Sequence, residues 1–198
     1  MDVDIWAWVG DTQRQLYEAG NAGLALALGD LPAQALEGRY AQLDVMAPAV
    51  AQQAGVAEQP WLEFFARYWH LIGRIGDRAQ GEVALEDARA LVELARRDDV
   101  RDCPAAPAAV EALAIALANT DGPRYAAERL AVLGTALDGM GPDSPAYTGL
   151  TTQYILALLD AGTAQEAVAY SRSVTERLRA AEKAASWELA AAGVRALL

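Results

Sequence analysis

Apolar positions recur at steps of three and four residues along most of this chain. The clearest stretch is 60–75, in which apolar and aromatic residues fall at i, i+3, i+4, i+7, i+8 and i+11: Trp61, Phe64, Phe65, Tyr68, Trp69 and Ile72. This spacing places the side chains on one face of an amphipathic helix. An aromatic stripe of this kind is typical of a helix that packs into a hydrophobic core.

The same periodicity predicts further helices, separated by turns that contain Gly, Pro or Asp. The segment 21–28 either continues the first helix or forms a short one. Pro48 is expected to kink or divide the predicted helix 32–54. Pro32 and Pro123 suit the first turn of a helix. With 21–28 counted as part of the first helix, the predicted ranges are 4–28, 32–54, 60–75, 82–97, 108–119, 123–139, 145–161, 163–182 and 184–198, which give about eight or nine helices.

A loosely recurring unit runs through these helices. In each unit an apolar helical segment ends in a Gly or Asp turn, and a second, Ala-rich helical segment follows. The predicted turn residues are Gly29, Gly76, Asp121 and Gly162, which lie 47, 45 and 41 residues apart. A period of this order predicts stacked helical hairpins.

Composition favours an all-α protein with one sizeable core. The chain has 198 residues, of which 54% are hydrophobic, with abundant Ala and little Val, Ile or Thr. It contains no apolar run of the length that a membrane-spanning helix needs. We expect a single domain over 1–198. Because the helix 184–198 ends without a cap, this domain is either complete or cut from a longer protein.

The net charge is −11, and residues 1–60 carry most of it, with eight acidic and two basic residues. An acidic chain repels phosphate backbones, so we expect no nucleic-acid binding. The charge either serves solubility or attracts a basic partner. The acidic start MDVDIWAWVGD differs from a secretory signal or a mitochondrial presequence, and this predicts a cytoplasmic location.

Motifs for catalysis, cofactors and metals are missing from the sequence. It has no P-loop, no GxGxxG and no GxSxG, and Lys183 and His70 are its only lysine and histidine. Asp98, Asp99 and Asp102 sit among arginines, which indicates a solvated loop rather than a metal site. Cys103 cannot form an internal disulfide and is interpreted as an ordinary loop thiol. We therefore expect no enzyme activity, no cofactor and no metal.

The units resemble tetratricopeptide-like helical repeats, in a variant with helices longer than the 34-residue period of that family. The third unit carries the resemblance best, with Val110, Leu113, Ala114, Leu117, Asp121, Ala126 and Leu130. The fourth unit contributes Leu158, Gly162, Ala167 and Val168, and the second contributes Phe65, Tyr68, Ile72 and Gly76. The resemblance implies a right-handed α-solenoid of antiparallel helical hairpins with a concave binding face.

With Gly76 at the turn position, the resemblance implies which residues line that face. They are Glu63, His70 and Arg74 in the second unit, Glu111 and Asn119 in the third, and Thr152 in the fourth. The leading hypothesis is a non-catalytic module that binds a protein or peptide segment with apolar anchors and some basic residues.

Three alternatives stay open. One is a ligand-sensing or dimerising domain of a bacterial regulator. Another is a helical small-molecule binder or enzyme, with Trp61, Phe65, Tyr68 and Trp69 forming an apolar pocket around His70. The last is self-association: the apolar positions Leu189, Val194, Leu197 and Leu198 on the helix 184–198 would suit a homodimer.

Overall fold

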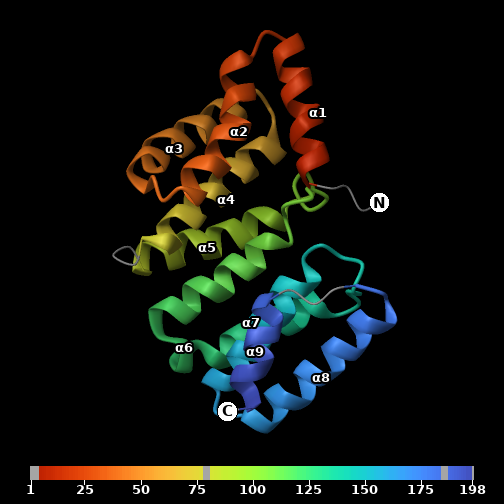
Figure 1. Cartoon of the computed structure of the whole chain (residues 1–198). Helices are drawn as coiled ribbons and strands as arrows, with labels where there is room; N and C mark the ends of the chain where they lie inside the picture. The colour runs from red at the N-terminus through yellow and green to blue at the C-terminus, as the bar shows by residue number, and fades with distance from the viewer. Residues whose placement is uncertain (1–4, 78–80, 184–186, 198) are drawn as a thin grey trace. The chain divides into compact units, whose positions relative to one another are not determined.

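The computed structural model describes residues 5–77, 81–183 and 187–197, and in these ranges it contains nine α-helices and no strand (Figure 1). The helices are α1 (Ile5–Glu18), α2 (Ala22–Leu36), α3 (Tyr40–Val56), α4 (Pro60–Gly76), α5 (Gly81–Ala95), α6 (Ala108–Leu137), α7 (Tyr147–Asp160), α8 (Ala164–Ala180) and α9 (Trp187–Leu197). The all-α prediction is confirmed. Within the described ranges, no helix has both the length and the apolar character that crossing a membrane requires.

Backbone contacts group the chain into two compact units, Met1–Ala112 and Leu113–Leu198. The expected single repeat domain over 1–198 and its right-handed solenoid stay predictions. Each unit is held together by packing between neighbouring helices: α1 to α5 in the first, and α7, α8 and α9 in the second.

One hydrogen-bonding motif ends five of the helices. A residue with positive φ follows the helix, and the next N–H donates to the carbonyl oxygen five residues earlier. Glycine adopts this conformation without a Cβ clash, at Gly20, Gly38 and Gly162, whereas Glu58 and Glu182 adopt it with a side chain. The five bonds are Asn21 to Leu16 (2.8 Å), Arg39 to Gln34 (2.9 Å), Gln59 to Ala54 (2.9 Å), Thr163 to Leu158 (3.0 Å) and Lys183 to Leu178 (2.9 Å).

The predicted turn at Gly29 is wrong. Helix α2 runs through Gly29 and has Pro32 inside it. The reason is packing, because Leu28 and Leu31 on either side of the expected break are fully buried and hold one helix together there. The predicted helix 32–54 is in fact divided at Gly38, and Pro48 lies inside a continuous α3.

The other predicted turns fall where helices end or break. Helix α4 ends at Gly76, and Gly162, with φ +78°, follows the C-cap residue Ala161 of α7. The predicted helices 108–119 and 123–139 together form α6, whose backbone leaves the helical conformation at Asp121 (φ −164°, ψ 88°). Asp121 then caps the second half of α6, since its Oδ1 accepts a hydrogen bond from the Arg124 N–H at 3.2 Å.

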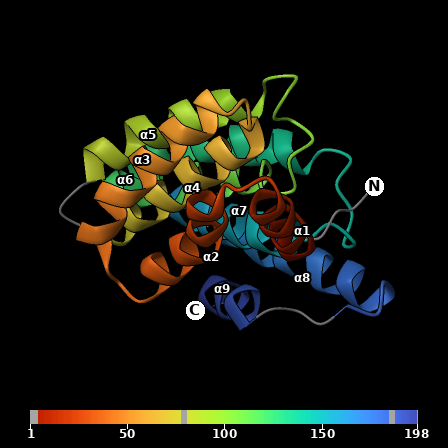
Figure 2. The ribbon, with the colours of Figure 1, turned by 90° about the horizontal axis from the view of Figure 1, so that it is seen from above.

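The aromatic stripe of α4 forms the centre of the first unit, as predicted. Phe64 and Phe65 are fully buried, and the Phe65 ring lies edge-on to Trp8 of α1 and to Trp69. Figure 2 shows α3, α4 and α5 running side by side. α3 and α4 approach closely at Gly73, where a Cβ would lie 2.5 Å from a methyl carbon of Leu43, so a larger residue at this position would force the buried Leu43 side chain to shift.

In the second unit, α7, α8 and α9 enclose an apolar core. Its buried residues include Ile155, Val174, Leu178 and Leu189. On α9, Val194 and Leu197 are exposed, while Leu189 of the same predicted stripe is buried. Leu198 lies outside the described residues, and the homodimer through this helix stays a prediction.

Candidate functional site

Polar residues occupy the side of α4 that the aromatic core leaves free. Glu63, Arg67, His70 and Arg74 follow one another at intervals of three or four residues, which places them along one stripe of the helix. The neighbouring helix α5 presents Asp87, Leu91 and Leu94 at the same intervals. These two stripes form the walls of the candidate site.

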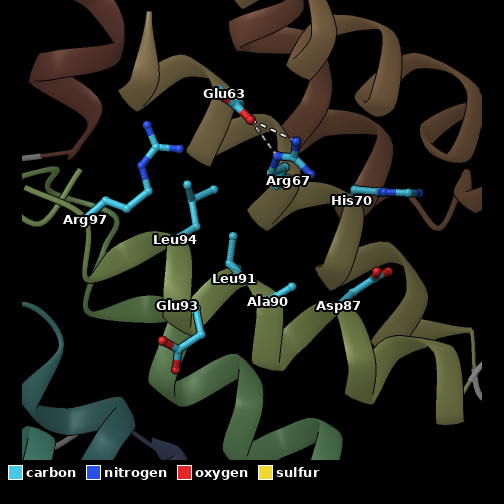
Figure 3. A pocket seen from close by; sticks show the side chains of 9 residues that line it. All are labelled: Glu63, Arg67, His70, Asp87, Ala90, Leu91, Glu93, Leu94 and Arg97. Atoms are coloured by element: carbon cyan, nitrogen blue, oxygen red, sulfur yellow. Dashed lines mark hydrogen bonds and ion pairs between the residues drawn. The ribbon is translucent and has the colours of Figure 1, made fainter. Parts of the chain in front are cut away.

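A pocket of about 390 Å³ lies between α4 and α5 (Figure 3). Leu91 and Leu94 provide its apolar floor, and charged side chains form its rim. The side chains that line it are those of Glu63, Arg67, His70, Asp87, Ala90, Leu91, Glu93, Leu94 and Arg97.

One end of the pocket is fixed by a network of two carboxylates, one guanidinium and one imidazole. His70 Nε2 lies 2.8 Å from Asp44 Oδ1 of α3. The guanidinium of Arg74 bonds to Asp87 Oδ2 and lies 3.5 Å from Asp44 Oδ1. Arg74 of α4 contacts Asp44 of α3 on one side and Asp87 of α5 on the other. It therefore sets the positions of both carboxylates.

Two local ion pairs set the other end. Arg67 donates to Glu63 Oε1 at 2.9 Å from Nε, and its Nη2 lies 2.8 Å from the same oxygen. Arg97 donates from Nε and Nη2 to the two carboxylate oxygens of Asp99, at 3.1 and 2.6 Å. This two-point hydrogen bond is the main reason why the pKa of Asp99 is lowered and the pKa of Arg97 is raised.

The loop after α5 is tied back to α4 beside this ion pair. The indole N–H of Trp61 donates to the backbone carbonyl of Asp99 at 3.0 Å. Asp99 is therefore held by Arg97 through its side chain and by Trp61 through its backbone, and Asp98 Oδ1 lies 3.1 Å from Arg101 Nη1. In the described part of the chain, no group of three or more His, Cys, Asp or Glu side chains is arranged to hold a metal ion.

The structure brings three of the predicted groove residues together at one pocket. Glu63 and His70 line the pocket, and Arg74 lies next to it. Glu111 belongs to the first unit but does not line the pocket. It lies close enough to Tyr68 to contribute, after burial, to raising the pKa of that phenol to about 12.

Asn119 and Thr152 belong to the second unit and do not line this pocket. Asn119 is exposed. Thr152 is buried, and its hydroxyl donates to the Thr148 carbonyl oxygen at 2.7 Å, so it has little surface to offer a partner. The prediction applied one repeat pattern to every unit and so placed Asn119 and Thr152 on the same face. The exposure of each side chain depends on its packing, which the pattern does not include.

The aromatic pocket considered around His70 does not match the structure. None of the four rings is among the residues that line the pocket with His70. Phe65 and Trp69 are buried in the core beside α1, on the other side of α4. Helical periodicity explains this, because residues one position apart project about 100° from each other.

Sequence reasoning missed Arg67, Asp87 and Arg97 as site residues. Arg67 carried a signal, since it lies one helical turn from both Glu63 and His70. Asp87 and Arg97 had no comparable signal, because their role depends on which face of α5 turns toward α4.

Comparison with known families, curated proteins and solved structures gives no match for this chain. The resemblance to tetratricopeptide-like repeats therefore stays a prediction that rests on the residues quoted for it. What the fold itself defines is a class: an all-α protein whose first unit carries a charged pocket with an apolar floor.

Cys103 lies in the loop between α5 and α6, as expected, but only 2% of it is exposed. Burial raises the pKa of its thiol to about 11. We expect a thiol-specific reagent at pH 8 to react about 100-fold more slowly with the folded chain than with the chain in denaturant, because two pKa units remove that much thiolate.

The same pKa shift predicts how stability changes in alkali. Burial favours the protonated thiol in the folded state. The contribution of this preference to the free energy of unfolding is complete below the unfolded pKa of 9.0 and is lost as the pH rises through the folded pKa of about 11. Denaturant titrations at pH 8 and pH 10.5 measure it, with Cys103→Ala as the control that should lose this part of the pH dependence. An unchanged pH dependence of stability in Cys103→Ala would contradict the stability prediction, and equal thiol reaction rates in the folded and denatured chains would contradict the rate prediction.

Proposed function

We propose that this chain is a non-catalytic interaction module that binds a polypeptide segment in the pocket between α4 and α5. The observation that carries the proposal is the pocket itself: an apolar floor of Leu91 and Leu94 inside a charged rim. Its volume of about 390 Å³ falls within the range of roughly 300–1,000 Å³ that is typical of ligand sites.

The length of the pocket supports an elongated ligand. Asp87 and Arg97 mark its two ends along α5 and the turn that follows. Ten residues at the helical rise of ~1.5 Å each correspond to about 15 Å, the length of four or five residues of an extended chain at ~3.3 Å each. A polypeptide segment that places one apolar side chain on the leucines fills such a site.

The small-molecule alternative has less support. The Nε2 atom of His70 is already engaged by Asp44, and among the described residues that line the pocket there is no Phe, Tyr or Trp ring to sandwich a flat ligand. We also propose that the helices belong to a tetratricopeptide-like solenoid and that the protein works in the cytoplasm. The free thiol of Cys103 fits a reducing compartment.

A peptide-display selection tests the proposal. The whole chain is immobilised, a random peptide library is selected on it, and the affinity of each enriched peptide is measured for the wild type and for Leu94→Ser. We expect this substitution to weaken binding about tenfold, because losing an apolar contact in a binding site costs ~1–2 kcal/mol.

Val83→Ser is the matched control. Val83 is an exposed apolar residue of the same helix and does not line the pocket, so its replacement should change affinity by less than about twofold. Circular dichroism of both variants confirms that they fold. If the library yields no enriched peptide, or if the two substitutions weaken binding equally, the pocket is not the binding site.

A further inference from the structure

The hydrogen-bonding atoms that the pocket leaves unused differ between its two ends. Asp87 bonds to Arg74 through Oδ2, and within the described part of the chain its other oxygen, Oδ1, accepts no hydrogen bond. The side chain of Asp87 is 39% exposed, whereas that of Arg74 is only 23% exposed. A carboxylate oxygen on the rim therefore remains for a cationic group that arrives from outside.

The guanidinium groups of Arg67 and Arg97 behave differently. Arg67 is held by Glu63, and Arg97 is held at two points by Asp99, so each positive charge has a carboxylate beside it. Each guanidinium still has a free Nη1, because the bonds to described residues use only Nε and Nη2. Neutralised guanidinium N–H groups suit the carbonyl oxygens of a peptide backbone and do not oppose a basic ligand.

The leucine floor lies one helical turn from Asp87. Asp87 and Leu91 are four residues apart on α5, which corresponds to about 6 Å along the helix axis. In an extended peptide, side chains two positions apart lie on the same side and about 6.6 Å apart. One extended segment can therefore place a basic side chain at Asp87 and an apolar side chain on the leucines at the same time.

From this match we infer that the pocket takes an extended segment in which a basic residue and an apolar residue are separated by one position. The inference rests on the proposed function and specifies its ligand. The charge of the chain agrees with it, since residues 1–60 alone carry eight acidic and two basic residues and attract a basic segment at long range.

The test uses three synthetic peptides that differ at one position: acetyl-Ala-Lys-Ala-Leu-Ala-amide and the same peptide with Gln or with Glu in place of Lys. Binding is followed by two-dimensional NMR of the isotopically labelled chain, which detects weak complexes. We expect the Lys peptide to bind at least about fivefold more tightly than the Gln peptide, and the Glu peptide to bind most weakly.

Asp87→Asn then identifies the partner of the lysine. This substitution keeps the shape of the side chain and removes its charge, so the advantage of the Lys peptide over the Gln peptide should fall below about twofold. Glu86→Gln is the matched control, because Glu86 is an exposed carboxylate on the same helix that does not line the pocket. With Glu86→Gln the fivefold advantage should remain.

Several results would overturn the inference. One is equal or tighter binding of the Gln or Glu peptide to the wild type, which needs no variant and decides the matter even if Asp87→Asn fails to fold. Another is that Asp87→Asn and Glu86→Gln reduce the affinity advantage of the Lys peptide over the Gln peptide equally. If library peptides bind in a Leu94-dependent way but lack a basic residue two positions from an apolar one, this inference fails and the binding module stands. If neither library peptides nor the probes bind, both proposals fail.

Discussion

Replacing Asp160 by Ala is expected to lower the free energy of unfolding by about 3 kcal/mol. Asp160 pairs with Arg129, whose side chain is fully buried, while Asp160 itself is 32% exposed. The pair uses Arg129 Nη1, and no group among the described residues bonds to Arg129 Nε or Nη2. Removing Asp160 leaves a buried guanidinium with no counter-charge, a change that typically costs ~3–5 kcal/mol, and the partial exposure of Asp160 favours the lower value. Denaturant titration followed by circular dichroism measures the change.

An exposed ion pair in the same unit provides the control. Asp143 lies 3.4 Å from Lys183, and both side chains are well exposed, so Asp143→Ala should change the free energy of unfolding by less than about 1 kcal/mol. The double variant Arg129→Met/Asp160→Ala should recover most of the loss, since an apolar side chain needs no counter-charge. The account is wrong if Asp160→Ala destabilises no more than Asp143→Ala.

Phe65→Ala is the second change for which a large effect is expected, a loss of about 3–5 kcal/mol. The Phe65 side chain is fully buried between Trp8 and Trp69, with ring centroids 5.5 and 6.1 Å away. Truncating it leaves a cavity where α1 meets α4 and removes two edge-on ring contacts. Denaturant titration gives the energy, and a red shift of the tryptophan emission reports that Trp8 and Trp69 have become more accessible to water.

Tyr17→Ala controls for the loss of an aromatic residue as such. Tyr17 is half exposed on α1, so its replacement should cost less than about 0.5 kcal/mol and leave the emission unchanged. If both substitutions cost the same, Phe65 does not hold α1 to α4.

Helix ends show why some boundaries were predictable and others were not. The apolar period of 60–75 predicted α4 to within a residue, because burial on one face requires that period. Gly29 and Gly38 look alike in sequence, yet Gly38 ends α2 and Gly29 lies inside it. Only the burial of Leu28 and Leu31 distinguishes the two glycines, and burial depends on the helices packed around them.

The candidate site divides in the same way. The sequence by itself determined that the protein is helical, that the aromatic side of α4 is buried, and that Glu63, His70 and Arg74 lie together on the opposite side, since these follow from a fixed helical period. Only the tertiary structure decided that α5 turns Asp87, Leu91 and Leu94 toward them, that Arg74 joins Asp44 to Asp87, and that Thr152 is buried. The physical reason is that a period fixes the direction of side chains around one helix, whereas a pocket depends on how two helices are rotated against each other, which the packing of the whole unit sets.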